Sequence, residues 1–213
     1  MKVLLTSAGL ETEEIKEYFV NMVGKDMSLV KALFIPTAAI DAGAIEVLPK
    51  CMNDLLKCGI IDKNINVYDL HAGMEIEEMR QYDIVYLCGG NTHYLLERIN
   101  GTKFNKSLME YISGNGAVIG VSAGSLIFSN NLCNNLGLID TKLDVHCITG
   151  ERRGKLAYPL PRNLICIVGY VTQQSFTFGQ LWNFQIDDIS INGHFSDKGA
   201  HIVDACQCHL LLD

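Results

Sequence analysis

The sequence predicts an α/β fold: a doubly wound, mostly parallel sheet with helices on both faces. Along residues 1–150, short runs that are apolar at every position alternate with segments whose apolar residues recur at helical spacing. Strands that are apolar along their whole length are typical of a parallel sheet covered on both sides. Small and polar residues follow several of these runs, as expected where ligands gather at the carboxyl edge of such a sheet.

Each element follows from its own residues. The mostly apolar runs at 3–7, 32–35, 84–88 and 117–121 are predicted strands, as is the more polar segment 66–70. Apolar side chains gather on one face of 12–23, 44–58, 92–99 and 104–112, which are predicted helices, as is 123–130. Thr12 suits the start of the first helix because its hydroxyl can accept from a first-turn N–H group, and Gly59 suits the end of the second. Pro36 ends the second strand because proline cannot donate to a sheet.

Beyond residue 150 the alternation ends. Glycines and prolines interrupt this part of the chain at Gly154, Pro159, Pro161, Gly169, Gly179, Gly193 and Gly199. Residues 164–171 and 186–191 favour strands, and no segment has clear helical spacing. The sequence therefore predicts a β-rich, irregular C-terminal third. Because the chain shows no repeat, low-complexity tract or linker, we expect a single α/β domain over residues 1–213.

The composition excludes several classes of partner. The 213 residues include 24 acidic and 17 basic side chains, for a formal net charge of −7. Affinity for nucleic acids and anionic membranes depends on Lys and Arg, so we expect neither as a partner. Acidic residues appear from Glu11 onwards, too early for a signal peptide, and the apolar stretch 116–128 is shorter than the about 20 residues of a membrane span. We therefore expect a cytoplasmic protein.

The cysteines do not indicate a metal or a cofactor. The chain has eight, but no C-x-x-C pair and no Cys/His series with zinc-ligand spacing. Without an export signal, the expected state is a reduced thiol. The sequence thus predicts no metal site and no cofactor.

The most informative motif is G-x-S-x-G at residues 120–124, with Ser122 at its centre. It follows a predicted buried strand and precedes a predicted helix, which is the setting of a nucleophile elbow. A sharp strand-to-helix turn points the serine outward, and small neighbours allow a backbone to approach. The alternative is a Gly-Ser turn that only begins a helix. We favour Ser122 as a nucleophile.

A second loop, at residues 89–92, follows the strand at 84–88. Gly89 and Gly90 can adopt positive φ and expose backbone N–H groups, which suits an oxyanion hole or a carboxylate site. Asn91 or Thr92 could instead serve only as the cap of the next helix. Both interpretations are compatible, so Gly89, Gly90 and Asn91 are predicted oxyanion or substrate-binding residues.

His146 is the preferred candidate for a general base. It lies 24 residues after Ser122 and follows a short alternating run. A lone histidine is more often structural, but the other histidines are less suitably placed. His71 ends a strand, His93 lies inside a helix, and His194, His201 and His209 belong to the irregular tail.

Four segments in this order resemble the dipeptidase E (aspartyl dipeptidase) family of serine peptidases. They are 5–9 (LTSAG), 34–38 (FIPTA), 89–92 (GGNT) followed by YLL, and 120–125 (GVSAGS). Residues 136–139 (LGLI), leading to His146, resemble the segment that carries that family's catalytic histidine. The resemblance covers about residues 1–150. It implies the class I glutamine amidotransferase-like fold, Ser122 as nucleophile, His146 as general base, and an oxyanion hole formed by the amides of Gly90 and Ala123.

Residues 151–213 diverge from the family pattern. The nearest match to the family's next motif is 171–176, which lacks the expected alanine. The third member of a triad therefore stays open. The acidic candidates are Asp144, Glu151, Asp187 and Asp188, and the neutral candidates are Gln173, Gln174 and a backbone carbonyl.

Two functions remain in competition. The first is a serine-type peptidase, a monomer or homodimer, that hydrolyses small peptides, among them those with an N-terminal aspartate, as the resemblance implies. Arg152 or Arg153 could bind the aspartate side chain, unless both belong to a solvated turn. The alternative is a catalytically impaired member that binds a small ligand or a partner. An amidotransferase glutaminase is disfavoured because that chemistry uses cysteine at the position of Ser122.

Overall fold

The chain forms a parallel sheet extended by one antiparallel strand. The computed structural model describes residues 1–140, 142–143 and 145–146, together with the backbone of short strands between 165 and 183. In these parts, one sheet has the order β3-β2-β4-β5-β1-β6-β9. Its parallel strands are β1 (Lys2–Thr6), β2 (Ala32–Ile35), β3 (Ile65–Val67), β4 (Ile84–Leu87), β5 (Ala117–Val121) and β6 (Ile165–Ile167), and β9 (Leu181–Asn183) runs antiparallel to β6. A separate antiparallel pair consists of β7 (Tyr170–Val171) and β8 (Phe176–Thr177).

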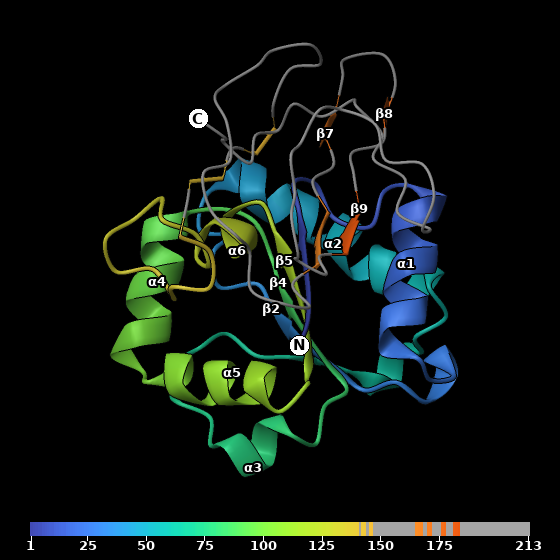
Figure 1. Ribbon diagram of the computed structural model, residues 1–213, viewed down its shortest axis with the longest axis horizontal. Coiled ribbons are helices and arrows are strands. Elements are labelled where there is room, and N and C mark those ends of the chain that lie inside the picture. The colour runs from blue at the N-terminus through green and yellow to red at the C-terminus, as the bar shows by residue number, and fades with distance from the viewer. Residues whose placement is uncertain are drawn as a thin grey trace.

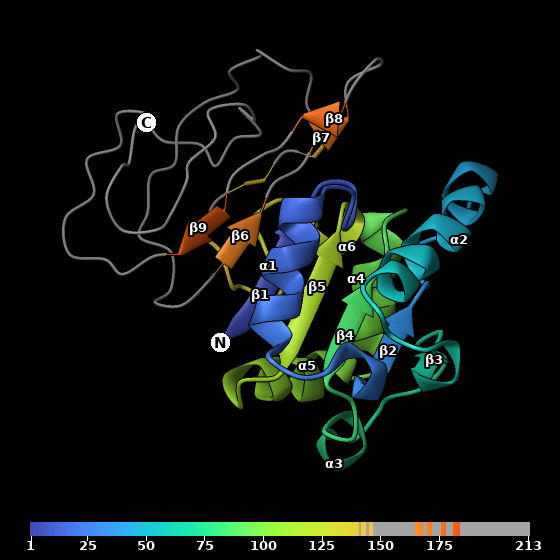
Figure 2. The same ribbon diagram turned by 90° about the vertical axis from the view of Figure 1, so that its right-hand side faces the viewer.

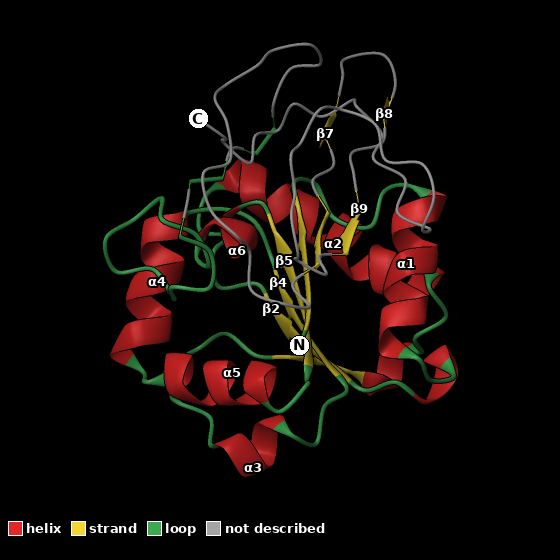
Figure 3. Cartoon of the chain, viewed as in Figure 1, coloured by secondary structure: helices red, strands yellow, loops and turns green. Residues whose placement is uncertain are grey.

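Helices cover both faces of the sheet, as the sequence predicts (Figures 1 and 3). One face is covered by α1 (Glu13–Val23) and α2 (Ala42–Lys57), and the other by α3 (Ile76–Met79), α4 (Thr92–Gly101), α5 (Phe104–Ser113) and α6 (Ala123–Leu126). Alternate residues of each central strand pack on opposite sides. In β4, for example, Val85 and Leu87 pack towards α4 and α5, whereas Ile84 and Tyr86 pack towards α1 and α2. The doubly wound α/β prediction is confirmed.

Local signals placed most element ends correctly. The Thr12 hydroxyl accepts a hydrogen bond from Ile15 N at 3.3 Å and begins α1. Gly59 follows the end of α2 with a φ of +97°, a left-handed conformation that glycine adopts without a steric penalty. The Thr12 side chain thus marks where α1 begins, and the lack of a side chain at Gly59 marks where α2 ends.

Three elements differ most from the sequence prediction. Strand β3 is shorter than the predicted 66–70, because the chain turns at Leu70, a buried residue with a φ of 40°. Helix α6 ends at Leu126, short of the predicted residue 130, and Ser129 instead bridges to Ile139. Helix α3 has only four residues and was not predicted, since so short a helix carries no periodicity. The predicted run at 186–191 lies outside the described residues.

The strand order determines where a site can form. Strands β4, β5 and β1 are adjacent in the sheet, and all three are parallel, so the loops that follow them meet at one edge. Figure 2 shows this edge at the top, with α6 directly beyond the end of β5. No helix of the described residues is both long and apolar enough to span a membrane.

Candidate active site

Ser122 occupies a sharp turn between β5 and α6. Its backbone has φ 50° and ψ −111°, an unfavourable conformation for a residue with a side chain. Its N–H group donates to Thr6 O of the neighbouring strand at 2.9 Å. The turn needs Gly124 because a Cβ there would lie 2.3 Å from Leu87 O. Only a glycine at this position lets α6 pack so closely on β4. Residues 120–124 therefore form the strand-turn-helix geometry of an elbow.

A second serine holds this turn against β1. Ser125 is buried, and its hydroxyl lies 2.8 Å from both Thr6 O and Gly120 O. The same oxygen accepts from Thr6 N at 3.1 Å. The Thr6 hydroxyl donates in turn to Gly120 O at 3.2 Å. These contacts connect the start of α6 to two strands, so the unfavourable backbone of Ser122 is held from several sides.

His146 lies beside Ser122 although 24 residues separate them. Its Nε2 is 2.8 Å from Ser122 Oγ, within hydrogen-bond distance. Its backbone N–H group donates to the buried hydroxyl of Ser7 at 2.7 Å. His146 has a φ of 57°, so this residue also adopts the left-handed region. Ser122 and His146, the two residues predicted from the sequence to be catalytic, therefore lie side by side.

The residues nominated for the oxyanion hole surround the elbow. A Cβ at Gly89 would lie 3.1 Å from Ser122 Cβ, so the β4 loop passes directly beside the serine. Gly90 has a φ of +135°, and a Cβ there would meet Ala38 O at 2.1 Å. Ala123 is the first residue of α6, where helical N–H groups have no partner within the helix. The N–H groups of Gly90, in the loop after β4, and of Ala123, at the start of α6, thus both lie in segments next to Ser122.

Asn91 has a structural role through its side chain. Its Oδ1 accepts from Tyr94 N at 2.9 Å and caps α4, which is the alternative that the sequence left open. Its N–H group donates to Ala38 O at 2.7 Å. Both groups are therefore occupied in holding the loop that contains Gly89 and Gly90.

This arrangement has the components of nucleophilic acyl transfer. A hydroxyl on a strained turn lies within hydrogen-bond distance of an imidazole nitrogen, which can accept its proton. Glycine-rich and helix-initial N–H groups are adjacent, where they can stabilise an oxyanion. Among the described residues, no group of three or more His, Cys, Asp or Glu side chains could hold a metal ion.

Comparison with known sequences identifies the family to which this arrangement belongs. The profile of peptidase family S51 matches residues 3–141, which include β1, the glycine loop and the elbow. The chain belongs to peptidase family S51. The predicted resemblance to the dipeptidase E family is thereby confirmed.

Individual relatives agree with this assignment. An uncharacterized peptidase of Listeria monocytogenes is 28% identical over 130 residues, 61% of this chain and 61% of that protein. One from Listeria innocua is 29% identical over 116 residues, 54% of this chain and 53% of that protein. The crystal structure of a candidate peptidase E from Listeria monocytogenes is 26% identical and has a TM-score of 0.53, covering 67% of this chain and 77% of that one. The chain thus matches 61% and 53% of the length of the two uncharacterized peptidases.

Cys88 precedes the glycine loop but is not placed to be a nucleophile. Its side chain is buried on the α1/α2 face of the sheet, and burial raises the pKa of its thiol well above the ordinary value. Nearby, the buried Asp54 carboxylate accepts from Leu10 N at 2.9 Å, and burial raises its pKa. Cys88 and Asp54 therefore belong to the support beneath the loops of β1 and β4.

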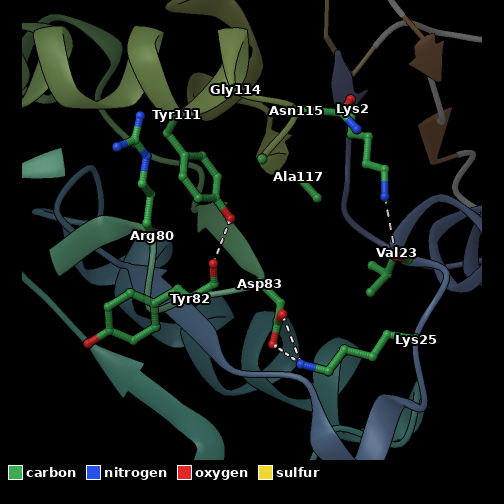
Figure 4. A pocket seen from close by; sticks show the side chains of 11 residues that line it. Lys2, Val23, Lys25, Arg80, Tyr82, Asp83, Tyr111, Gly114, Asn115 and Ala117 are labelled. Atoms are coloured by element: carbon green, nitrogen blue, oxygen red, sulfur yellow. Dashed lines mark hydrogen bonds and ion pairs between the residues drawn. The ribbon is translucent and has the colours of Figure 1, made fainter. Parts of the chain in front are cut away.

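A hollow of about 280 Å³ lies away from the elbow, at the amino ends of the strands (Figure 4). Its lining includes Lys2 and Lys25, but Lys2 Nζ donates to Val23 O at 3.3 Å and Lys25 Nζ contacts both carboxylate oxygens of Asp83 at 2.9 Å. Lys2 thus binds a carbonyl at the end of α1, and Lys25 pairs with a neighbouring carboxylate. The hollow shares no residue with the elbow.

Several sequence candidates lie outside the described residues, and some supporting residues were not predicted. The candidates outside the described residues are Asp144, Arg152, Arg153, and the other carboxylates and the glutamines considered for the third triad position. Sequence reasoning missed Ser125, Ser7 and Asn131, which bond to the elbow or to the segment that carries His146. Ser7 and Ser125 both lie in family motifs, so a signal existed for these two residues. Asn131 lies in a loop without periodicity, and no pattern indicates its contacts.

Proposed function

We propose that this chain is a serine-type peptidase of dipeptides or short peptides, with Ser122 as the nucleophile and His146 as the general base. The observation that carries the proposal is the 2.8 Å separation of Ser122 Oγ and His146 Nε2 at the edge where β4, β5 and β1 end. Membership of peptidase family S51 supports the reaction class. Serine is the nucleophile because the elbow of this chain presents a hydroxyl rather than a thiol.

The reaction proceeds by two acyl-transfer steps. Ser122 Oγ attacks the peptide carbonyl as its proton passes to His146 Nε2, and the N–H groups of Gly90 and Ala123 stabilise the oxyanion. The tetrahedral intermediate collapses, the C–N bond breaks, and His146 returns the proton to the leaving amine. Water then attacks the acyl-serine with His146 again as base, which releases the acid and restores the Ser122 hydroxyl.

The proposed substrates are small peptides, among them those with an N-terminal aspartate. The support for aspartate is the family resemblance together with Arg152 and Arg153, which follow His146 closely in sequence. An arginine suits this task because its guanidinium binds a carboxylate through two parallel hydrogen bonds. Replacing the arginine that binds should lower kcat/KM for an aspartyl dipeptide about 10- to 100-fold more than for an alanyl dipeptide.

The test combines covalent labelling with peptide hydrolysis. A fluorophosphonate should attach to the wild-type chain at one site, which peptide mass mapping should place at Ser122. The Ser122→Ala variant should take up no label, while Ser113→Ala should still be labelled because Ser113 is exposed at the end of α5 and does not contact the elbow. Labelling elsewhere, or hydrolysis of aspartyl and alanyl dipeptides by Ser122→Ala at the wild-type rate, would contradict the proposal.

A further inference from the structure

The segment that carries His146 is held by one side chain from the loop after α6. Asn131 contacts Leu143, three residues before His146, through both ends of its amide. Its Oδ1 accepts from Leu143 N at 2.8 Å, and its Nδ2 donates to Leu143 O at 2.8 Å. This two-way contact reproduces the pairing that a neighbouring strand would provide, and Leu143 is buried.

Asn131 is itself oriented from the side of the nucleophile. The Ser129 hydroxyl lies within hydrogen-bond distance of Asn131 Oδ1 and also 2.9 Å from Leu126 O, the last residue of α6. Helix α6 begins directly after Ser122. A continuous path of contacts thus runs from the nucleophile's helix through Ser129 and Asn131 to the segment of the base.

The far end of this segment is held by β1. The Ser7 hydroxyl accepts from His146 N at 2.7 Å, and Ser7 is fully buried at the end of β1. His146 has a φ of 57°, which is unfavourable for a residue with a side chain and persists only where surrounding contacts hold it. Asn131 and Ser7 therefore constrain the backbone on both sides of residue 145.

We infer that Asn131 is a positioning residue for His146, with Ser7 as the second support. This inference rests on the proposed function, since it assigns Asn131 the task of keeping His146 Nε2 in reach of Ser122 Oγ. Displacing a catalytic group by about 1 Å can reduce the rate about 100-fold without affecting substrate binding. Asn131 acts through the backbone of Leu143 and does not touch the reacting atoms.

The chain offers a matched control for this role. Asn135 is half-buried in the same loop, and it too bonds the backbone in both directions. Its Nδ2 donates to Leu132 O and its Oδ1 accepts from Gly137 N, each at 2.6 Å. Neither contact reaches the segment of His146. Asn135→Ala therefore removes two bonds between a side chain and the backbone from the same loop without releasing the base.

The experiment measures dipeptide hydrolysis and the rate of fluorophosphonate labelling per folded chain for Asn131→Ala and Asn135→Ala. For Asn131→Ala we expect kcat and the labelling rate to fall together about 10- to 100-fold, with KM within about twofold of wild type. Asn135→Ala should stay within about twofold in all three. Ser7→Ala should fall in the same direction as Asn131→Ala. If Asn131→Ala does not fold, Asn131→Asp, which keeps the shape but cannot donate to Leu143 O, replaces it.

Equal kcat values in Asn131→Ala and wild type, or a rise in KM alone, would overturn the inference. So would equal losses in Asn131→Ala and Asn135→Ala, which would indicate general loosening of the loop. Crystal structures of the wild type and Asn131→Ala separate this inference from the peptidase proposal. If the wild type neither hydrolyses peptides nor takes the label, but Asn131→Ala moves the imidazole away from Ser122, positioning stands and the peptidase proposal fails. If the wild type is active and the imidazole does not move, positioning fails alone.

Discussion

The proposed nucleophile and the proposed base are held in different ways. Ser122 lies between β5 and α6, and the backbone around it is bonded to β1 by Ser122 N and by the buried Ser125 hydroxyl. His146 lies in a segment that no described helix or strand contains, and side chains of Ser7 and Asn131 bond to that segment. Ser122 is part of the core architecture, whereas His146 is attached to it by side-chain contacts.

This difference predicts different sensitivities. Changes around Ser122 should disturb the packing of central strands and therefore affect folding. Changes around His146 should affect the rate while the sheet is unaltered, because the hydrogen bonds from Ser7 and Asn131, of about 1 kcal/mol each, lie outside the sheet's ladder. The comparison can be tested by variants on each side.

The largest effect is expected from removing the proposed nucleophile itself. Ser122→Ala should reduce kcat for dipeptides by more than about 1,000-fold, because no other hydroxyl on this edge is placed next to His146 Nε2 among the described residues. Thermal unfolding should change little, since the side chain is only partly buried. A variant that keeps more than a few per cent of the wild-type rate would remove Ser122 from this role.

A glycine on the nucleophile side tests the claim that packing holds the elbow. Gly124→Ala places a methyl group 2.3 Å from Leu87 O, so β4 and α6 must separate, at a cost of about 3 kcal/mol. Gly101→Ala is the control, because a Cβ there meets no atom within 4 Å and lies in a helix. Denaturant unfolding should show a loss for the first and none for the second. Equal stabilities would mean that the elbow is not tightly packed.

The pH dependence of the rate tests the base side. A neutral imidazole is required to accept the proton of Ser122, so kcat/KM should fall about tenfold per pH unit below about pH 6, where imidazoles become protonated. The measurement is a pH–rate profile of dipeptide hydrolysis from about pH 5 to 8 for the wild type and His146→Gln. A flat wild-type profile, or the same acidic decline in His146→Gln, would exclude His146 as the base.

The smallest effect concerns the support beneath the β1 loop. Burial raises the pKa of Asp54 above its ordinary value of 3.8. As pH rises from 3.8 through the raised pKa, the unfolded chain releases this proton before the folded chain does, so the free energy of unfolding falls. Asp54→Asn keeps an oxygen for Leu10 N and has no charge to bury, so it should lack this decline and be slightly more stable at pH 7. Denaturant unfolding of the wild type and Asp54→Asn at several pH values tests this. If the free energy of unfolding changes with pH equally in both proteins, the idea is wrong.

Much of the fold could be predicted from local patterns. Fully apolar runs identified β1, β2, β4 and β5, because a strand buried on both faces needs apolar residues at every position. Caps such as Thr12 act over a single turn, so they could be recognised from neighbouring residues. The edge strand β3 was displaced from its prediction because its end depends on the turn at Leu70 rather than on hydrophobicity.

The site was only half determined by the sequence. The G-x-S-x-G motif specifies a strand, a turn and a helix through local steric demands, so the elbow around Ser122 could be read from five residues. The distance between Ser122 and His146 could not, because it depends on how β1 and the loop after α6 pack on β5. The contacts of Ser7 and Asn131 join residues 139 and 12 positions apart in the chain. Hydrogen bonds between such distant residues leave no periodic pattern, so only the tertiary structure decides where the imidazole lies.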